Sequence, residues 1–587
     1  MTSLIARLTE TVSRAFAEEG LPEDLGVVIE SDRPDLAPYQ CNGAMAAAKL
    51  AKKPPRAVAE AVAARLKAAE PDLGVEIAGP GFLNLAPPAS FYAGRADAIA
   101  ADPRAGAGLA AKSLKIMLDF GGPNVAKPMH VGHLRSAVIG DCLQRLLAFR
   151  GHEAISDVHL GDWGLQMGHL VTELQDEQPG LPYFDPDFTG PYPEDSPVTI
   201  EDLSRLYPQA SAKAKEDPER NARSQKATAE LQAGRPGYRA LLAHFIAVSI
   251  KALKADYEAL GVTFDLWKGE SDVNDLIPGM VEDFKARGVA EESEGAWVVR
   301  VAEEGEKREL PPLILVSRQG SALYATTDLA TILDRRNAYD PDLVLYVVDL
   351  AQSDHFEQVF RAAIKAGLAA PGALEHVKFG TVNGPDGKRL RTRSGGTFKL
   401  ADLIGEAYAR AKSRLEEAGL GQELSETEFD TVARAVANAA IKFSDLSNVR
   451  TTNYIFDLDR FVSFEGKTGP YLLYQAVRVK SLMRKAAEKG FEPGPVTITD
   501  PAEAALVRRL DGFETALVRA EEGRAPHILC EHAYSLAQAF SGFYAACPIL
   551  PEADAAVRAS RLRLAETTLT QLELVLGLIG LDVPERM

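Results

Sequence analysis

Cysteine is scarce in this sequence, and its scarcity excludes two kinds of protein. The 587 residues include only four cysteines, Cys41, Cys142, Cys530 and Cys547, and no two are spaced as a CxxC pair. A fold held together by disulfides would need more cysteines, and a zinc site ligated by cysteines would need them at closer spacing. We therefore expect a reducing compartment and predict a cytoplasmic location.

Long apolar runs and a targeting segment are also missing. No uncharged apolar stretch reaches the roughly 18–20 residues that span a bilayer, so no membrane partner is expected. The first residues, MTSLIARLTETVSRAFAEEG, predict an amphipathic helix with acidic residues and without the cleavage site of a signal peptide.

Positive charge is in deficit. The chain has 65 Lys and Arg against 83 Asp and Glu, which gives a net charge of −18. That balance argues against a protein coated in nucleic acid, but a local basic face can still bind it.

The patterns that are present predict three domains. Residues 1–110 combine helical stretches with the strand-like VEIAGPGFLNLAP and end at a Gly/Ala-rich linker, which indicates a small α+β domain. Residues 111–400 alternate helical patterns with short apolar runs such as LILVS, LVLYVVD and VKFGTV, which predicts a parallel sheet of βαβ units. A Pro/Asp-rich segment at about 173–236 indicates an insertion, and residues 401–587 show helical spacing without strands.

One stretch, GGPNVAKPMHVGH at residues 121–133, connects a predicted strand (SLKIMLDF) to a predicted helix (HVGHLRSAVIGDCLQRLLAFRG). Gly151 is placed for a left-handed cap at the end of that helix. Open α/β sheets bind ligands outside the carboxyl ends of their strands, and helix N-termini attract phosphate. The stretch is therefore a candidate phosphate-binding loop.

Four residues of this loop suit nucleotide chemistry. His130 and His133 lie three apart, so both can face one side of the first helical turn and donate hydrogen bonds to phosphate oxygens. Lys127 can reach the same phosphates, and Gly132 lets a nucleotide approach the backbone. Taken alone, two such histidines are more often a surface pair, or half of a zinc site that no Cys or Glu with helical spacing completes.

The whole string is more specific than its parts. HVGH (His130 to His133) resembles the class I aminoacyl-tRNA synthetase signature His-Ile-Gly-His, and PNVAKPMHVGHLRSA is similar to its arginyl-tRNA synthetase form. VHLGDWGLQMG, YATTDLA, QSDHF, GKRLRTRSGGTFKLADL, SFEGKTGPYLLYQAVR and GLIGLDVPERM follow in the family's order, and IAGPGFLNL precedes them. The resemblance covers nearly the whole chain.

The resemblance implies a fold and a reaction. The fold would be a Rossmann-like parallel-sheet catalytic domain with an insertion, between a small α+β tRNA-contacting domain and an all-α anticodon-binding bundle. The enzyme would use ATP to activate L-arginine as arginyl-adenylate and transfer it to the terminal adenosine of tRNA(Arg). Mg²⁺ would accompany ATP, no protein metal ligand is predicted, and we expect a monomer.

The family's arginine-binding positions fall on residues that accept hydrogen bonds, as a planar cation with five donors requires. By resemblance, Asp119, Tyr324 and Asp328 would face the guanidinium, while Asn124 and Gln352 would take the α-amino end. Singly, Asp119 could start a turn, Asp328 could cap the helix LATILDRR, and Tyr324 could belong to a core.

The resemblance implies His130, His133, Lys127, Arg391 and Arg393 as catalytic residues. The usual Lys-Met-Ser-Lys-Ser signature is replaced by RTRSGG at 391–396, and Lys127 occupies the place of a lysine thought to compensate. Without its neighbours, GKRLRTRSGG would be a solvated basic loop. A smaller departure is Gly121-Gly122, where relatives often carry Ser. The predicted ATP-contacting residues are Asn124, Val125, Ala126, Lys127, Pro128, Met129, His130, Val131, Gly132, His133 and Leu134.

Aromatic and basic residues on GPYLLYQAVRVKSLMRKA predict a tRNA-binding surface. Tyr471, Tyr474 and Arg478, with Lys480 and Arg484 beyond them, suit unstacked bases and backbone phosphates. A core helix with solvated ends is an equally good interpretation of each residue. The resemblance also implies a contact between residues 39–45 and the tRNA elbow.

Two other functions stay open. A nucleotidyl-transfer enzyme of the same sheet superfamily would use the histidine loop without tRNA, but the long helical C-terminal domain argues against it. A non-catalytic paralogue would only bind tRNA or arginine, but the intact His130, His133, Lys127 and Asp328 argue against that.

Overall fold

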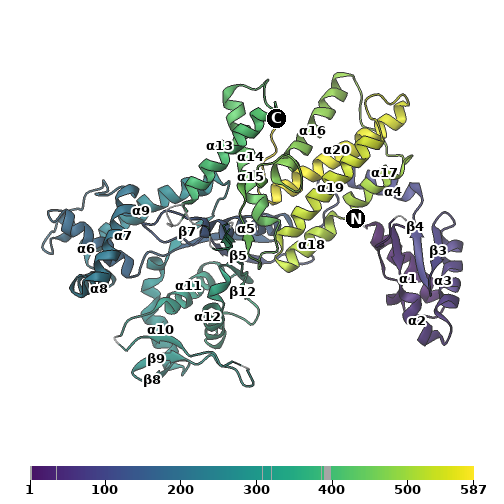
Figure 1. Cartoon of the computed structure of the whole chain (residues 1–587). Helices are drawn as coiled ribbons and strands as arrows, with labels where there is room; N and C mark the ends of the chain where they lie inside the picture. Colours follow the sequence, from purple (N-terminus) through teal and green to yellow (C-terminus); the bar gives the residue numbers. More distant parts are fainter. Residues whose placement is uncertain are drawn as a thin grey trace.

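The structure is a computed structural model, and it describes residues 3–34, 36–306, 308–318, 320–384, 386–388, 390 and 398–587. Figure 1 shows a small N-terminal domain, a central α/β region and a set of long C-terminal helices. The N-terminal domain lies beside the C-terminal helices at one end of the molecule, and the helices of residues 165–232 form the opposite end.

A five-stranded parallel sheet forms the centre of the molecule, which confirms the predicted α/β fold. Its strands are, in spatial order, β12 (Leu374–His376), β11 (Leu343–Val347), β5 (Lys115–Phe120), β6 (Glu153–Leu160) and β7 (Leu266–Gly269). The chain runs outward from β5 through β6 to β7 and then returns to β11 on the other side of β5. This reversal opens a crevice at the carboxyl ends of β5 and β11, where open α/β sheets bind ligands.

Two runs that the sequence assigns to this sheet lie elsewhere. LILVS forms β10 (Leu313–Val316), which pairs antiparallel with β9 (Ala296–Val299) in a separate sheet completed by β8 (Glu291–Ser293). Its side chains alternate between buried and exposed, which suits a sheet with one solvated face. VKFGTV supplies only an isolated bridge at Phe379 and the start of β13 (Val382–Asn383).

The expectation that strands end before residue 401 is wrong at one point. The short strand β14 (Tyr454–Ile455) pairs in parallel with β13, and the N–H of Gly380 donates to the carbonyl of Arg450. The backbone after β12 therefore leaves the central sheet because it bonds to a segment about 70 residues later in the chain.

Helices carry the chain between the strands of the sheet. α5 (Val131–Phe149) follows β5, and Gly151 beyond it has the positive φ, +93°, that its position predicts. The chain between β6 and β7 forms α6 (Leu165–Glu177), α7 (Ile200–Glu216), α8 (Pro218–Gln232) and α9 (Pro236–Ala259). The helices around the later strands are α10 (Ile277–Ala286), α11 (Tyr324–Tyr339) and α12 (Ser353–Lys365).

The N-terminal domain is α+β, as predicted. Its antiparallel sheet has the order β1 (Val28–Glu30), β2 (Tyr39–Cys41), β4 (Phe82–Ala86) and β3 (Gly74–Ala78). The helices of this domain are α1 (Leu4–Glu18), α2 (Gly43–Ala51), α3 (Pro55–Ala69) and α4 (Ala89–Ala100).

The C-terminal region is otherwise helical and packs against both other parts. Its helices are α13 (Leu400–Glu417), α14 (Glu426–Leu446), α15 (Leu458–Phe461), α16 (Gly469–Glu488), α17 (Pro501–Asp511), α18 (Phe513–Gly523), α19 (Pro526–Ala546) and α20 (Ala555–Leu578). One continuous hydrophobic core joins buried residues from α1 to the residues after α20. Across the described ranges, every helix is too short or too polar to span a bilayer.

Candidate active site

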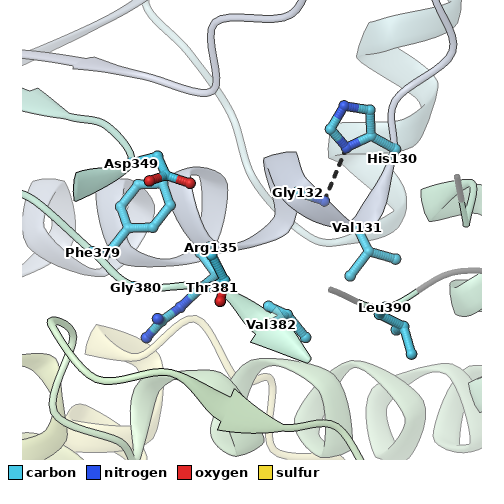
Figure 2. Close-up of a pocket in the computed structure, with 10 residues that line it drawn as sticks. All are labelled: His130, Val131, Gly132, Arg135, Asp349, Phe379, Gly380, Thr381, Val382 and Leu390. Carbon is cyan, nitrogen blue, oxygen red and sulfur yellow. Dashed lines mark hydrogen bonds between the residues drawn. The ribbon is translucent and has the colours of Figure 1, made fainter. Parts of the chain in front are cut away.

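The two histidines of the signature lie at the start of α5, and each is fixed by one ring nitrogen. His130 is the N-cap residue, and its Nδ1 accepts a hydrogen bond from the Gly132 N–H at 3.0 Å, as Figure 2 shows. The Nδ1 of His133 accepts from the His130 N–H at 3.1 Å, and the ring centroids lie 3.9 Å apart. Because both Nδ1 atoms accept, each neutral ring carries its proton on Nε2 and can donate it to a ligand.

His133 stays neutral in the native protein. Burial, with smaller contributions from the neighbouring His130 and Lys127, lowers its pKa to about 3. A surface pair would titrate near the ordinary value of about 6.5. The arrangement therefore supplies fixed hydrogen-bond donors at a helix N-terminus, where the backbone already attracts anions.

The loop that leads into α5 depends on glycine. Gly121 and Gly122 have φ values of +88° and +21°, and a Cβ on Gly121 would lie 2.5 Å from the Tyr257 hydroxyl. The Gly121 N–H donates to the Ser136 hydroxyl at 2.8 Å, and that hydroxyl donates to the Val347 carbonyl. The loop thus has no space for a side chain at Gly121, and both positions use the positive φ that glycine adopts most readily.

A cavity of about 260 Å³ opens beside His130 (Figure 2). The first turn of α5 forms one wall, and the segment after β12 forms the opposite wall. Its lining residues are His130, Val131, Gly132, Arg135, Asp349, Phe379, Gly380, Thr381, Val382 and Leu390.

A second cavity of about 210 Å³ adjoins the first and shares Gly132, Asp349 and Phe379 with it. It lies in the crevice between β5 and β11, and His133 and Ser136 line it from α5. Among the predicted arginine-binding residues, Asp119, Tyr324, Asp328 and Gln352 line this cavity. The structure thus brings the histidine loop and the predicted arginine pocket together at one edge of the sheet.

The second cavity is acidic. Asp328 pairs with His355, whose Nε2 lies 2.6 Å from the carboxylate, and the Tyr324 ring stacks on His355 at 4.9 Å. The carboxylates of Asp328, Glu270 and Asp119, together with burial, raise the pKa of the Tyr324 hydroxyl. Carboxylates gathered around a phenol are a suitable binding site for a planar cation.

Glu270 is a further carboxylate near this cavity, close enough for its charge to act on Asp328 and Tyr324. Burial, with smaller contributions from the charges of Asp162 and Asp328, raises the pKa of Glu270 to about 7. Glu270 directly follows β7, a strand that the sequence did not reveal. The only available signal was an acidic residue after a short apolar run, which is too common to be informative.

The alternative interpretations of single residues are decided by their contacts. Asp328 lies in the second turn of α11, which begins at Tyr324, so it is not a helix cap. Tyr324 is 54% exposed and is not a core residue. Asp119 lies within β5 and does not start a turn. Its carboxylate pairs with the buried Arg335 at 2.7 Å, and Arg335 also pairs with Asp157 at 2.8 Å.

Some predicted contacts lie away from the two cavities. Asn124 lines neither cavity, and its side-chain oxygen accepts from the Gln166 amide at 3.3 Å. The Lys127 ammonium lies 4.5 Å from the centroid of the Tyr207 ring on α7. Arg391 and Arg393 lie outside the described residues. The side chains of Val125, Ala126, Met129 and Leu134 are buried in the core.

The predicted tRNA-binding residues on α16 are half-buried beside other aromatic rings. Tyr471 lies 5.8 Å from Tyr534, and Tyr474 lies 6.4 Å from Phe464. The Arg478 guanidinium lies 5.3 Å from the Tyr544 ring. These contacts hold the three side chains in place at the edge of the core, with part of each still exposed.

Other predicted tRNA contacts are restricted. Lys480 pairs with Glu573 at 2.8 Å and with Glu585 at 2.6 Å, so its charge is already compensated. In the segment 39–45, Tyr39 and Cys41 are buried on β2, whereas Asn42 and Met45 are exposed.

Comparison with known families decides between the possible functions. The model of the class I (R) tRNA synthetase catalytic domain matches residues 98–458, which is more than half of the chain. The chain belongs to the class I arginyl-tRNA synthetase family. The models of the arginyl-tRNA synthetase N-terminal domain and of the DALR anticodon-binding domain match residues 2–86 and 472–587.

Relatives of this arginyl-tRNA synthetase family member match along its whole length. It is 66% identical to the arginine–tRNA ligase of Maricaulis maris and 61% identical to that of Hyphomonas neptunium, with 100% of each chain covered. Its fold is similar to the arginyl-tRNA synthetases of Plasmodium falciparum (TM-score 0.80, 23% identity) and Thermus thermophilus (TM-score 0.77, 24% identity), again over 100% of both chains.

Proposed function

We propose that the two adjoining cavities hold the two small substrates of an arginine–tRNA ligase. The chain activates L-arginine with ATP and transfers it to tRNA(Arg), as its family membership shows. The observation that assigns the cavities is the acidic crevice around Tyr324, which meets the cavity beside His130 at Gly132, Asp349 and Phe379. This geometry supports a guanidinium in the acidic crevice and a triphosphate at the N-terminus of α5.

In the first step, the arginine carboxylate attacks the α-phosphate of ATP, and pyrophosphate leaves. The Nε2–H groups of His130 and His133 donate hydrogen bonds to phosphate oxygens as charge develops there. Lys127 contributes positive charge on the pyrophosphate side, and Arg391 and Arg393 are proposed to do the same. Mg²⁺ enters with ATP, since phosphate oxygens are ligands that it prefers.

In the second step, a ribose hydroxyl of the terminal adenosine of the tRNA attacks the activated carbonyl, and AMP leaves. Tyr471, Tyr474 and Arg478 are proposed to hold the anticodon arm, by stacking and by charge. We also propose that residues 1–110 contact the tRNA elbow, residues 111–400 perform the chemistry and residues 401–587 bind the anticodon. A monomeric state and a cytoplasmic location stay predictions.

In the arginine pocket, Asp328, Glu270, Asp119 and Tyr324 are proposed to face the guanidinium, and Gln352 to face the α-amino end. Asn124 is proposed to support the histidine loop without contacting arginine, because its side-chain oxygen is bonded to the Gln166 amide. A lysine ammonium would leave several of these acceptors unpaired. Selectivity of that origin reaches about 10⁴–10⁵, so no editing site is required.

The proposal is tested by ATP-dependent charging of tRNA with labelled arginine, with lysine and omitted tRNA as controls. Asp328→Asn removes one charged partner of the guanidinium, worth about 1.5–3 kcal/mol, so kcat/KM for arginine should fall about 10–150-fold. KM for ATP should stay unchanged. Asp334→Asn, on the same helix but paired with Lys268 outside the cavities, is the matched control. An unaltered kcat/KM for arginine in Asp328→Asn would refute the pocket assignment.

A further inference from the structure

A third cavity, of about 440 Å³, lies where the N-terminal domain meets the helices α17, α18 and α19. Ser3 and Glu30 line it from the N-terminal domain, and Arg508, Arg519 and His527 line it from the helices. None of its lining residues belongs to the two cavities described above. It is therefore a separate site, and the proposed chemistry does not use it.

The acidic residues of this cavity are already paired with cations. Asp511 pairs with the buried Arg95 at 2.5 Å and accepts the Leu4 N–H at 2.9 Å. Glu531 pairs with Lys467. The Glu30 carboxylate lies 3.5 Å from the Arg509 guanidinium. These pairs cancel the negative charge of the cavity lining.

Two arginines of the cavity have no carboxylate partner within the described part of the chain. Arg508 is half-buried beside the Tyr92 hydroxyl, whose pKa it lowers against the larger effect of burial. Arg519 is exposed and makes no ion pair with a described residue. The cavity thus has surplus positive charge in a protein whose net charge is −18.

His527 lies in the same cavity, close to these cationic side chains. Burial lowers its pKa, and the charges of Lys467, Arg519 and Arg450 lower it further. Its Nδ1 is buried and has no hydrogen-bond partner among the described residues. A ligand with several acceptor oxygens would satisfy both the arginines and this nitrogen.

A chain of side-chain contacts links the cavity to the aromatic face of α16. Lys467, the partner of Glu531, lies 5.9 Å from the Tyr534 ring, and Tyr534 lies 5.8 Å from Tyr471. A ligand in the cavity would therefore be the neighbour of whatever binds Tyr471. A long polyanion can occupy both positions at once, whereas a free anion occupies only one.

We propose that this cavity binds backbone phosphates of the tRNA between the anticodon-binding helices and the N-terminal domain, with Arg508 and Arg519 as the phosphate ligands. This inference rests on the proposed function, which supplies tRNA as the ligand, and it extends the proposed tRNA-binding surface beyond α16. The planar guanidinium matches phosphate with two parallel hydrogen bonds, and the surrounding hydroxyls add weaker ones.

The test measures tRNA binding directly, across a range of salt concentrations, for Arg508→Gln, Arg519→Gln and the double variant. Each lost phosphate contact should reduce the slope of log K against log salt by about 0.7–0.9. In charging assays KM for tRNA should rise about 3–10-fold, while KM for ATP and arginine stay constant. Arg318→Gln, an exposed arginine at the β10 sheet, is the matched control.

The outcomes separate the possibilities. Arg508→Lys and Arg519→Lys keep the charge and should keep most of the slope, so an equal loss in the Lys and Gln variants would mean a structural role and overturn the proposal. An unchanged slope in the double Gln variant would also overturn it. Stabilisation of the wild type by 10 mM inorganic phosphate with an unchanged tRNA slope would assign the cavity to a free anion instead. If the wild type binds tRNA but does not charge it, the proposed function fails while the cavity is still tested by binding.

Discussion

The two histidines at the start of α5 use the two nitrogens of each imidazole ring for different purposes. In both His130 and His133 the Nδ1 atom accepts a backbone N–H and fixes the loop, and the proposed mechanism uses Nε2–H as the donor to phosphate. A substitution at either position therefore removes both a donor and part of the cap of α5.

His133→Ala should lower the rate of arginyl-adenylate formation about 10²–10³-fold, because one preorganised donor to developing charge is lost. Affinity for tRNA should stay nearly constant. Pyrophosphate exchange measured with tRNA present, together with direct tRNA binding, checks both statements. His244→Ala, in a histidine of α9 that bonds Tyr183, is the control. Equal losses of exchange and tRNA binding would show that His133 is structural.

We expect His532 to make stability depend on pH. It is buried against Phe513, with its Nε2 3.1 Å from the Gln571 side-chain oxygen, and burial lowers its pKa to about 4. The unfolded histidine titrates near 6.5, so between about pH 6.5 and pH 4 the unfolded state binds the extra proton. The free energy of unfolding should therefore fall as the pH falls through this window, by about 1.4 kcal/mol per pH unit from this group.

Urea unfolding at pH 5 and pH 7, compared between the wild type and His532→Gln, measures that contribution. The variant has no group that titrates at this position, so its stability should change less between the two pH values. The same pH dependence in both proteins would contradict the assignment to His532.

At the scale of elements, the loop before α5 is supported by the chain between β6 and β7. Ala126 has a φ of +66°, and its N–H donates to the buried Ser249 hydroxyl on α9 at 3.0 Å. The next residue, Lys127, places its ammonium over the Tyr207 ring of α7. These helices therefore restrict a long, flexible side chain that the proposed mechanism uses.

Tyr207→Leu should lower the rate of adenylate formation about 2–30-fold, which corresponds to a cation–π contact of about 0.5–2 kcal/mol. Tyr207→Phe keeps the ring and should keep the activity. In a Lys127→Ala background, Tyr207→Leu should have no further effect, because the contact is already absent. Additive losses, or a faster Tyr207→Leu enzyme, would show that Tyr207 does not hold Lys127 in its active position.

At the scale of the whole molecule, buried ion pairs join the helical region to the catalytic helix. Arg135 of α5 pairs with Asp445 of α14 at 3.1 Å, and both side chains are almost completely buried. Asp141 of α5 pairs with Lys442 of α14 at 3.3 Å in similar burial. Because Arg135 also lines the cavity beside His130, the position of α14 bears directly on the proposed ATP site.

Asp445→Asn should lower the free energy of unfolding by about 3–5 kcal/mol, because it leaves the Arg135 charge buried without its partner. Urea unfolding measures the change. Glu417→Gln breaks the exposed pair with Arg414 and should cost less than about 1 kcal/mol. Similar effects of the two substitutions would mean that the buried pair makes no special contribution.

Local patterns in the sequence determined several elements and the residues of the candidate site. Apolar runs predicted β5, β6 and β11, helical spacing predicted α5, and a glycine predicted the end of that helix, because such signals act within a few residues. The order of motifs identified the histidine loop and Asp119, Tyr324, Asp328 and Gln352, which line the two cavities. Residue types and their order were sufficient because a nucleotide loop and a guanidinium pocket need specific chemical groups.

Only the tertiary structure decided which strands pair and which side chains meet. LILVS has the composition of a sheet strand, but its partners β8 and β9 are chosen by packing. Glu270 joins Asp328 through a strand with no clear pattern, and Asn124 turns to Gln166 instead of the cavities. These outcomes depend on contacts between residues far apart in the sequence, where burial and charge, not local periodicity, set the free energy.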